Sequence, residues 1–366
     1  MTRLVAVYRV RADAASIAAR AESIAIEQSV EMPVSAIDDS HVLSDIVGRV
    51  EAITDRGDGG FDVRVALSLA TMGPEPGQLM NMLFGNTSIQ EDVSLEDVVL
   101  PEELSRAFSG PRHGIGGLRN LCGAEGRALT CSALKPQGLP PEALAALAGR
   151  LARGGLDFIK DDHGLADQSY SPFARRVAAC AKAVRDASAA TGVTTQYVPS
   201  LSGSLDQLRD ETRRARDEGV RCVLIAPMVV GVPSLAALTR EFPDMAFMAH
   251  PALAGASRLA PPLLLGKLFR LFGADATIFP NYGGRFSYAP ETCRRLADAA
   301  RGPWLGLKPS LPVPAGGMVL ARIDEMLDFY GADAMLLIGG GLLSARDGLV
   351  EAVAAFVERV ARHRDR

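Results

Sequence analysis

Short apolar segments alternate with longer segments of helical period over the last two thirds of the chain. We expect the apolar segments to form strands at Leu129–Leu134, Leu156–Lys160, Thr194–Val198, Cys222–Ala226, Ala246–Ala249, Ala276–Phe279, Trp304–Lys308 and Ala334–Ile338. We expect the helices that follow these strands to begin near Pro141, Pro172, Ser204, Pro233, Pro261, Pro290, Gly317 and Ser344.

Eight such strand–helix units in about 240 residues match the usual size of a (β/α)8 barrel. A doubly wound sheet is the alternative architecture, because the spatial order of the strands is not visible in the sequence. In a barrel, functional residues lie at the C-terminal ends of the strands and in the loops that follow them. Candidate residues are therefore expected at those positions.

The pattern before residue 128 is mixed. Val5–Val10 has the pattern of a strand, and Ala14–Gln28 has that of a helix. Two alternating segments, Arg49–Thr54 and Phe61–Leu67, flank a run rich in Gly and Asp and predict a hairpin. We therefore predict a ferredoxin-like α+β domain over residues 1–127 and a (β/α)8 barrel domain over residues 128–366.

Composition and charge exclude several classes of protein. The chain has 366 residues, of which 48% are hydrophobic and 22% charged, which is ordinary for a folded protein with a large core. The formal net charge is −4 and no basic stripe predicts nucleic-acid binding. No apolar run approaches the ~20 residues of a membrane span, and the N-terminus lacks the apolar core of a signal peptide. Five widely spaced cysteines favour a reducing cytoplasm over disulfides or structural zinc.

One predicted strand runs directly into four ionisable residues, Lys160, Asp161, Asp162 and His163. Burial penalises charge, so groups inside the fold at this place would need pairing or a metal. Carboxylates are hard oxygen ligands suited to Mg²⁺, and a neighbouring lysine can pair with them or act as a base. The alternative is a solvated strand end that holds a Lys–Asp ion pair.

A second lysine, Lys135, ends the first barrel strand and is expected next to Lys160 on the same rim. A cation there could stabilise an enolate or move a proton as acid and base. His250 ends the fifth strand, where a functional role and a merely packed imidazole are both open. Arg285, in the glycine-rich loop after the sixth strand, could hold an anion or belong to an ordinary turn.

Two glycine runs follow the last two predicted strands. At these strands many barrels bind phosphate through backbone N–H groups, and as a pair the runs favour an anion site. Each run alone also suits an ordinary strand–helix loop. The candidate phosphate-binding residues are Gly316, Gly317, Gly339, Gly340 and Gly341.

Taken together, these segments resemble RuBisCO over most of the chain. The run from Gly154 to Asp162 resembles the family motif Gly-Gly-Leu-Asp-Phe-x-Lys-Asp-Asp, and Leu134-Lys135-Pro136 resembles the end of its first barrel strand. The two glycine runs resemble its phosphate-binding loops. The resemblance implies Mg²⁺ as cofactor, with a carbamylated Lys160 and Asp162 as ligands and His163 at the third position, where the family has Glu. In the N-terminal domain, Glu27 and Asn86 resemble residues that complete the site of a partner subunit, which implies a homodimer.

Several departures from the family pattern remove groups that carboxylation needs. Gln137 stands where the family has a second lysine, and Pro251 and Ala254 stand where it has Arg and His. The loop that carries the carboxylation lysine is replaced by residues 281–285, which contain no lysine. The chain is therefore similar to the non-carboxylating form IV, or RuBisCO-like, proteins.

This resemblance implies an enzyme that enolises a small sugar-derived substrate. The expected function is metal-assisted proton transfer on a sugar phosphate such as 5-methylthioribulose 1-phosphate, in methionine salvage. In that interpretation Lys135, Lys160 and His250 are the candidate catalytic residues. The alternatives are a decarboxylase of a 3-oxo sugar acid of the 3-oxo-isoapionate type and a non-catalytic binding or regulatory descendant.

Overall fold

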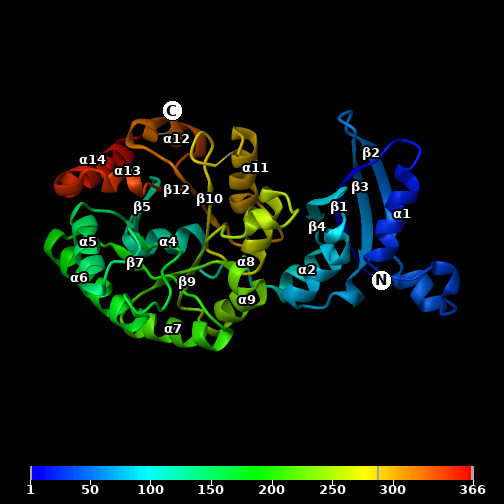
Figure 1. Ribbon diagram of the computed structural model, residues 1–366, viewed down its shortest axis with the longest axis horizontal. Helices are drawn as coiled ribbons and strands as arrows, with labels where there is room; N and C mark the ends of the chain where they lie inside the picture. Colours follow the sequence, from blue (N-terminus) through cyan, green and yellow to red (C-terminus); the bar gives the residue numbers. More distant parts are fainter. Residues whose placement is uncertain (1, 287, 364–366) are drawn as a thin grey trace.

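The computed structural model describes residues 2–286 and 288–363, and it places a four-stranded sheet beside a closed ring of strands (Figure 1). The N-terminal part runs in the order β1 (Arg3–Arg11), α1 (Ile17–Glu27), β2 (Arg49–Asp55), β3 (Gly60–Ser68), α2 (Pro76–Phe84) and β4 (Val93–Val99). Its strands lie in the spatial order β2-β3-β1-β4, and the ladders are antiparallel. This arrangement confirms the predicted ferredoxin-like fold, including the hairpin of β2 and β3.

Alternation along β1 explains how this sheet acquires a core. Leu4, Ala6, Tyr8 and Val10 are fully buried, whereas the residues between them are partly exposed. Because successive side chains of a strand point to opposite faces, these four residues form one apolar face. The Tyr8 hydroxyl donates a hydrogen bond of 2.6 Å to the carbonyl of Leu83 at the end of α2, so its polar atom is satisfied within the core.

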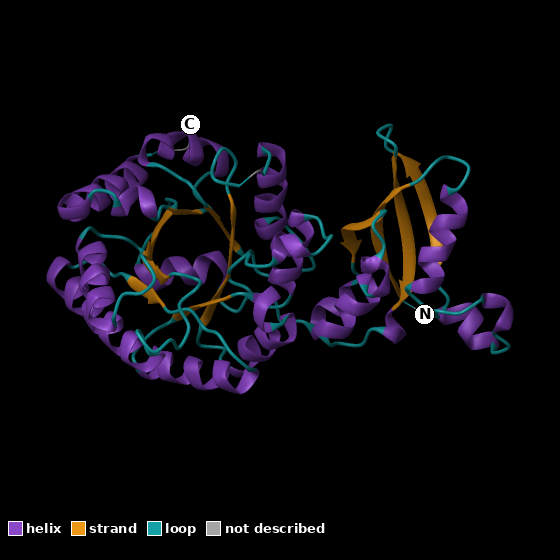
Figure 2. Ribbon diagram, in the orientation of Figure 1, coloured by secondary structure: helices purple, strands orange, loops and turns teal. Residues whose placement is uncertain are grey.

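Eight parallel strands form the barrel, which Figure 2 shows as a ring surrounded by helices. They are β5 (Leu129–Leu134), β6 (Phe158–Asp161), β7 (Gln196–Val198), β8 (Cys222–Ile225), β9 (Ala246–Ala249), β10 (Ala276–Pro280), β11 (Leu311–Ala315) and β12 (Met335–Leu337). The helices around them are α5 (Pro141–Arg153), α6 (Phe173–Thr191), α7 (Leu205–Asp217), α8 (Pro227–Val230), α9 (Val232–Glu241), α10 (Phe269–Leu271), α11 (Pro290–Arg301), α12 (Ile323–Tyr330), α13 (Gly340–Leu343) and α14 (Leu349–Arg362). The barrel prediction is confirmed, and the doubly wound alternative is wrong.

The barrel ladder is made of two four-stranded halves. One half has the order β12-β5-β6-β7, and the other has the order β11-β10-β9-β8. A single bridge between Ser200 and Leu224 links the halves beyond β7. The hydrogen-bond ladder is therefore continuous within each half and weak between them.

The predicted seventh strand, Trp304–Lys308, is wrong, because β11 lies at Leu311–Ala315. Proline cannot donate to a ladder, so Pro312 and Pro314 argue against a strand. The structure tolerates both because the Leu311 N–H donates to Asp275 on the β10 side. The nitrogens of the two alternate prolines then face the seam with β12, which has no ladder with β11. Two predicted helix starts are also displaced, from Gly317 to Ile323 and from Ser344 to Leu349.

Helix α4 (Gly114–Cys122) closes the N-terminal end of the barrel. Its Ile115 and Leu118 belong to the core inside the barrel. The buried carboxylate of Asp275 accepts hydrogen bonds of 2.7 Å from the N–H groups of both His113 and Gly114, which anchors the start of the helix. The proposed boundary at residues 127 and 128 falls after α4 and stays a prediction. A further short helix, α3 (Glu102–Ala107), precedes α4.

The N-terminal sheet contacts its own barrel through the outer edge of β4. Leu95 donates to the carbonyl of Arg258 and accepts from the N–H of Ala260, both at 2.9 Å. Lys267 forms an ion pair of 2.6 Å with Asp97 on the same strand. No helix within the described ranges combines the length and the apolar character that a membrane span requires.

Candidate active site

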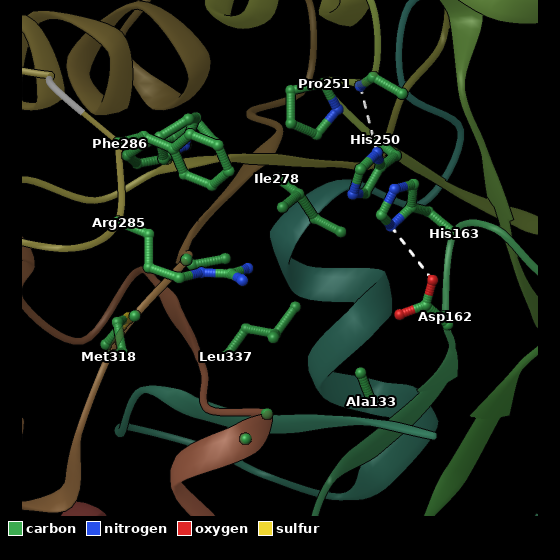
Figure 3. Close-up of a pocket in the computed structure, with 18 of the residues that line it drawn as sticks. Ala133, Asp162, His163, His250, Pro251, Ile278, Arg285, Phe286, Met318 and Leu337 are labelled. Atoms are coloured by element: carbon green, nitrogen blue, oxygen red, sulfur yellow. Dashed lines mark hydrogen bonds and ion pairs between the residues drawn. The ribbon is translucent and has the colours of Figure 1, made fainter. Parts of the chain in front are cut away.

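The C-terminal ends of six barrel strands surround a pocket of about 920 Å³ (Figure 3). All the candidate residues predicted within the barrel line it: Lys135, Lys160, Asp162, His163, His250, Arg285, Gly316, Gly317, Gly339, Gly340 and Gly341. They come from the ends of β5, β6, β9, β10, β11 and β12. Residues more than 200 positions apart in the chain, Lys135 and Gly341, are thus assembled in one cavity by the strand order of the barrel.

The register between β5 and β6 brings the first lysine to the second aspartate. Ala133 lies opposite Lys160 and Leu134 opposite Asp161, so Lys135 continues the series beside Asp162. The Lys135 ammonium forms a close ion pair with the Asp162 carboxylate. The other carboxylate oxygen accepts hydrogen bonds from the Gln137 amide at 3.1 Å and the Gly164 N–H at 3.0 Å. Burial alone would raise the pKa of Asp162, but these donors more than offset it and hold the pKa well below its usual value.

Lys160 is only 4% exposed, and its side chain ends at the pocket floor. Its ammonium donates a hydrogen bond of 2.8 Å to the backbone carbonyl of Asp161. Burial lowers the pKa of Lys160, because removal from water disfavours the charged form. A lysine in this setting is a nucleophilic amine when it is neutral.

Asp161 does not face the pocket. Its carboxylate accepts hydrogen bonds from the Arg176 guanidinium at 3.0 Å, the Tyr197 hydroxyl at 2.8 Å and the Ser200 N–H at 3.1 Å. Both Asp161 and Arg176 are fully buried, so their ion pair is shielded from water. This pairing fixes the end of β6 from behind while Lys160 and Asp162 face the cavity.

Two imidazoles stack at the edge of the pocket. The ring centroids of His163 and His250 are 4.1 Å apart, and the ring planes differ by 10°. The Nδ1 atom of His250 accepts a hydrogen bond of 3.1 Å from the Ala252 N–H, which leaves its Nε2 as the N–H donor of a neutral ring. Burial and the nearby charge of Lys160 lower the pKa of His250 to about 2. His163 lies 3.4 Å from the Asp162 carboxylate, and burial lowers its pKa as well.

The first glycine run supports the neighbouring loop. Gly316 and Gly317 both have positive φ, a backbone conformation that glycine adopts more readily than other residues. A Cβ on Gly316 would lie 3.0 Å from the Phe286 ring, and a Cβ on Gly317 would lie 2.8 Å from the Arg285 nitrogen. The Arg285 N–H also donates a 3.0 Å hydrogen bond to the Gly316 carbonyl. Close packing of the loop after β10 is therefore one reason for glycine at both positions.

The second glycine run is open towards the cavity. A Cβ at Gly339 or Gly340 would meet no atom within 4 Å. Neither glycine is therefore needed to pack against other parts of the protein, and a ligand can approach this backbone closely. The space leaves room for an anion at the end of β12.

Arg285 is the cation of the loop that follows β10. Figure 3 shows its side chain reaching into the pocket from the side opposite Asp162. Its guanidinium carbon lies 5.6 Å from the centre of the Phe286 ring. Within residues 2–286 and 288–363 it forms no ion pair with a carboxylate, so its charge is available to a ligand.

Glu27 and Asn86 are brought together, but not at this pocket. The Asn86 amide donates hydrogen bonds to Glu27 at 3.0 Å and to Glu31 at 2.9 Å. The cluster lies at the end of α1 in the N-terminal domain, and neither Glu27 nor Asn86 lines the cavity of the same chain. Proximity in the fold is therefore observed, whereas a role in a partner's site stays a prediction.

The donor atoms at the pocket can be compared with the demands of Mg²⁺. Over the described part of the chain, no three His, Cys, Asp or Glu side chains are arranged to hold a metal ion. At the pocket, Asp162 supplies a carboxylate and His163 supplies an imidazole. Asp161 supplies no ligand there, because its carboxylate is turned towards Arg176. A carbamate on Lys160 would add two oxygens to this set. With the carbamate these residues fit a divalent cation, and the imidazole shifts the preference towards borderline metals.

Some residues of the site had a weaker signal in the sequence. Arg176 lies in the apolar stripe of α6 between Phe173 and Val177, a position at which an arginine indicates a buried partner. Tyr197 lies within β7 and has no comparable signal, because a tyrosine is ordinary in a strand. The stacking of His163 on His250 depends on the side-chain orientations of β6 and β9.

Comparison with known proteins gives a consistent picture. Residues 114–286 match the family of the ribulose bisphosphate carboxylase large chain, catalytic domain. The 5-methylthioribulose-1-phosphate isomerase of Rhodospirillum rubrum is 62% identical over 98% of this chain and 96% of its own length. The ribulose bisphosphate carboxylase-like protein 1 of Rhodopseudomonas palustris is 58% identical over 99% and 98%. The crystal structure of a RuBisCO-like protein from Rhodopseudomonas palustris superposes with a TM-score of 0.94 at 53% identity, covering 100% of this chain and 99% of that one.

Proposed function

Because the chain belongs to the RuBisCO-like proteins of the RuBisCO large-chain family, we propose that it is a non-carboxylating isomerase in methionine salvage. It moves a proton through an enolate of a sugar phosphate such as 5-methylthioribulose 1-phosphate. The observation that carries this proposal is the cluster of Lys135, Lys160 and Asp162 at the ends of two paired strands. The isomerase from Rhodospirillum rubrum, at 62% identity, supports the choice of substrate.

Lys135 is the proposed acid and base. Its side chain is paired with Asp162 at the pocket, where an ammonium can donate a proton or stabilise negative charge on an enolate oxygen. The Nε2–H group of the neutral His250 adds a hydrogen-bond donor at the same pocket.

We propose Lys160, Asp162 and His163 as the residues that hold a divalent cation, with Lys160 as its carbamate. A bound cation supplies Lewis-acid polarisation of the substrate carbonyl, which makes the neighbouring C–H more acidic. Mg²⁺ is the ion expected from the family, and His163 is the residue that weakens this preference. The ion pair of Asp161 with Arg176 keeps the two pocket-facing neighbours of Asp161 in place.

The phosphate of the substrate is proposed to bind at the glycine runs. Gly339, Gly340 and Gly341 offer an exposed backbone at the end of β12, and Gly316 and Gly317 line the same cavity. Arg285 provides a cation that has no carboxylate partner among the residues the structure describes. Backbone N–H groups and a guanidinium are the usual partners of phosphate oxygens. Gln137 and the lysine-free loop at residues 281–285 argue against carboxylation.

We further propose a homodimer in which Glu27 and Asn86 reach the pocket of the partner subunit. Their mutual hydrogen bond at the surface of the N-terminal domain supports a shared role. A cytoplasmic location is proposed on the five free cysteines, all of which are buried and unpaired.

Proton exchange tests this function directly. The wild-type protein is incubated in D₂O with Mg²⁺ and bicarbonate, 5-methylthioribulose 1-phosphate is added, and the reaction is followed by NMR. We expect a rearranged product with altered deuterium content, and we expect Lys160→Ala to abolish it. The matched control is Lys182→Ala on the exposed face of α6, where the same substitution should leave the rate unchanged.

Two outcomes would contradict the proposal. Folded wild-type protein that gives neither exchange nor product would exclude the isomerase, and release of carbon dioxide from 3-oxo sugar acids would then be measured. Full activity of Lys160→Ala would exclude the proposed metal site. Circular dichroism of each variant separates loss of function from loss of fold.

A further inference from the structure

The loop after β10, residues 281–286, begins with a buried polar side chain. Asn281 is only 1% exposed. Its side-chain oxygen accepts a hydrogen bond of 2.6 Å from the Tyr330 hydroxyl at the end of α12, and its side-chain nitrogen lies 2.9 Å from the Met326 sulfur. Its backbone N–H donates to the Ala315 carbonyl at 2.8 Å. Because an unmet polar group is costly inside a protein, these partners hold the start of the loop in one place.

Arg322, the residue before α12, holds the middle of the same loop. Its guanidinium donates hydrogen bonds of 2.7 and 2.6 Å to the two carboxylate oxygens of Glu325. The same group donates to the backbone carbonyls of Tyr282 and Gly283, each at 3.3 Å. Its carbon atom lies 5.1 Å from the centre of the Tyr282 ring, and the Tyr282 hydroxyl donates to Glu325 at 3.0 Å. One arginine therefore connects the loop to the first turn of α12.

The far end of the loop is held by the glycine pair after β11. The Arg285 N–H donates to the Gly316 carbonyl at 3.0 Å, and a Cβ on Gly317 would lie 2.8 Å from the Arg285 nitrogen. A Cβ on Gly283, whose φ is +64°, would lie 2.7 Å from a guanidinium nitrogen of Arg322. The loop is thus packed between the glycine pair and the start of α12. Mobile loops have few buried contacts and few internal hydrogen bonds, and this loop has the opposite character.

Arg285 depends on this packing for its position. Figure 3 shows its side chain reaching into the pocket. Among residues 2–286 and 288–363 its guanidinium has no carboxylate partner, and its aromatic neighbour, Phe286, belongs to the same loop. The loop backbone is therefore what holds this cation at the pocket. A charged group that is already in place binds an anion without the cost of ordering a flexible segment.

We propose that Arg322 and Tyr330 are positioning residues of the anion site: they fix the loop after β10, so that Arg285 is held at the pocket before a ligand binds. Neither Arg322 nor Tyr330 lines the pocket, so both act through the loop. The inference rests on the proposed function in assigning the substrate phosphate to Arg285. It adds that the loop meets the ligand as a preformed wall.

Loop order and anion affinity are measured on one set of proteins. Hydrogen exchange of the backbone over residues 281–286, followed by mass spectrometry, reports loop order without any ligand. The affinity for inorganic phosphate is measured by calorimetry, and kcat and KM are measured with 5-methylthioribulose 1-phosphate. Arg322→Met keeps the apolar stem of the side chain and removes its donors. Tyr330→Phe removes only the hydroxyl that binds Asn281.

Arg322→Met is expected to speed exchange in the loop by at least about fivefold and to weaken phosphate binding by about five- to tenfold. Arg285→Met should weaken phosphate binding by about 10-fold or more, and it should raise KM with little change in kcat. Because Arg322 acts through Arg285, the double variant should bind phosphate no more than about twofold more weakly than Arg285→Met alone. Tyr330→Phe should speed exchange and weaken phosphate binding as Arg322→Met does.

Arg359→Met is the matched control. Arg359 reaches α12 from α14 and donates hydrogen bonds of 2.9 and 2.7 Å to Asp324, next to the Glu325 that pairs with Arg322. Its loss removes a similar ion pair from the same end of α12, and it should change neither loop exchange nor phosphate affinity.

Unchanged loop exchange or unchanged phosphate affinity in Arg322→Met would overturn the proposal, and Tyr330→Phe decides in the same way if Arg322→Met does not fold. Additive losses in the double variant, or equal phosphate affinity of Arg285→Met and the wild type, would overturn it as well. Wild-type protein that binds phosphate through Arg285 without turning over the substrate would support the fixed loop and refute the proposed isomerase, so the two failures are distinguishable.

Discussion

Replacing Arg176 by Met should destabilise the protein strongly, although Arg176 does not line the pocket. Arg176 and Asp161 are both fully buried, and the guanidinium lies 3.0 Å from the carboxylate. Methionine keeps most of the apolar stem of arginine, so the main change is the loss of the charged partner. The carboxylate of Asp161 is then left buried without a cation.

The expected magnitude follows from what Asp161 retains. Removal of one partner of a buried ion pair usually costs about 3–5 kcal/mol. Asp161 would keep the Tyr197 hydroxyl at 2.8 Å and the Ser200 N–H at 3.1 Å, so we expect the lower end, about 3 kcal/mol. Asp161→Asn should also destabilise, because Arg176 then becomes the unpaired charge. The double variant should lose less than the sum of the two single losses, since it leaves no isolated charge.

Urea unfolding of the wild type, both single variants and the double variant measures this coupling. Arg175→Met is the matched control: Arg175 is the neighbouring residue on α6, and it pairs with Glu142 at the surface, where both side chains are 67% exposed. Its loss should cost less than about 1 kcal/mol. A cost below about 1 kcal/mol for Arg176→Met, or strict additivity in the double variant, would refute the assignment of a stabilising buried pair.

Two further predictions concern stability alone. Burial raises the pKa of Glu211 from its ordinary 4.5 to about 7, so the folded state binds the proton more tightly and stability falls, by about 3 kcal/mol at most, as pH rises from 4.5 through 7. Glu211→Gln should remove this dependence, and equal pH profiles of the unfolding free energy for variant and wild type would contradict it. Gly154→Ala should cost about 1–3 kcal/mol, because its Cβ would lie 2.3 Å from a methyl carbon of Val353. Gly116→Ala, inside α4 with open space around it, should instead stabilise by about 0.5–1 kcal/mol, and thermal unfolding of the two variants in the same direction would show this reasoning to be wrong.

The sequence predicts the barrel well where local pattern and tertiary structure agree. Strand–helix alternation located β5 and β10 almost to the residue, because a buried parallel strand is a short apolar run between helices. It failed at β11, where Pro312 and Pro314 are compatible with a strand only because their nitrogens face a seam without a ladder. That seam depends on the closure of the whole ring and has no local signal. The same limit applies to α4, whose place at the barrel floor is set by contacts with residues far along the chain.

The sequence predicts which strand ends carry the site residues, but it predicts fewer of the contacts between those residues. Lys135 and Asp162 could be placed on adjacent strands from motif spacing alone, and the structure adds their ion pair. Strand alternation predicts that Asp161 points away from Lys160, but its partners, Arg176 from the next helix and Tyr197 from the next strand, could not be foreseen. Identical residue types at neighbouring positions therefore acquire different roles only once the partners from other elements are in place.

The barrel has two seams, one between β7 and β8 and one between β11 and β12. They place different residues of the site on two separate halves of the barrel. The half formed by β12-β5-β6-β7 carries Lys135, Lys160 and Asp162, whereas the half formed by β8 to β11 carries His250, Arg285 and the glycine pair Gly316 and Gly317. Sequence change in the second block can alter which molecule is accepted while the strands that carry the acid–base groups keep their ladder. A barrel divided in this way can acquire new substrates during evolution and retain one kind of chemistry.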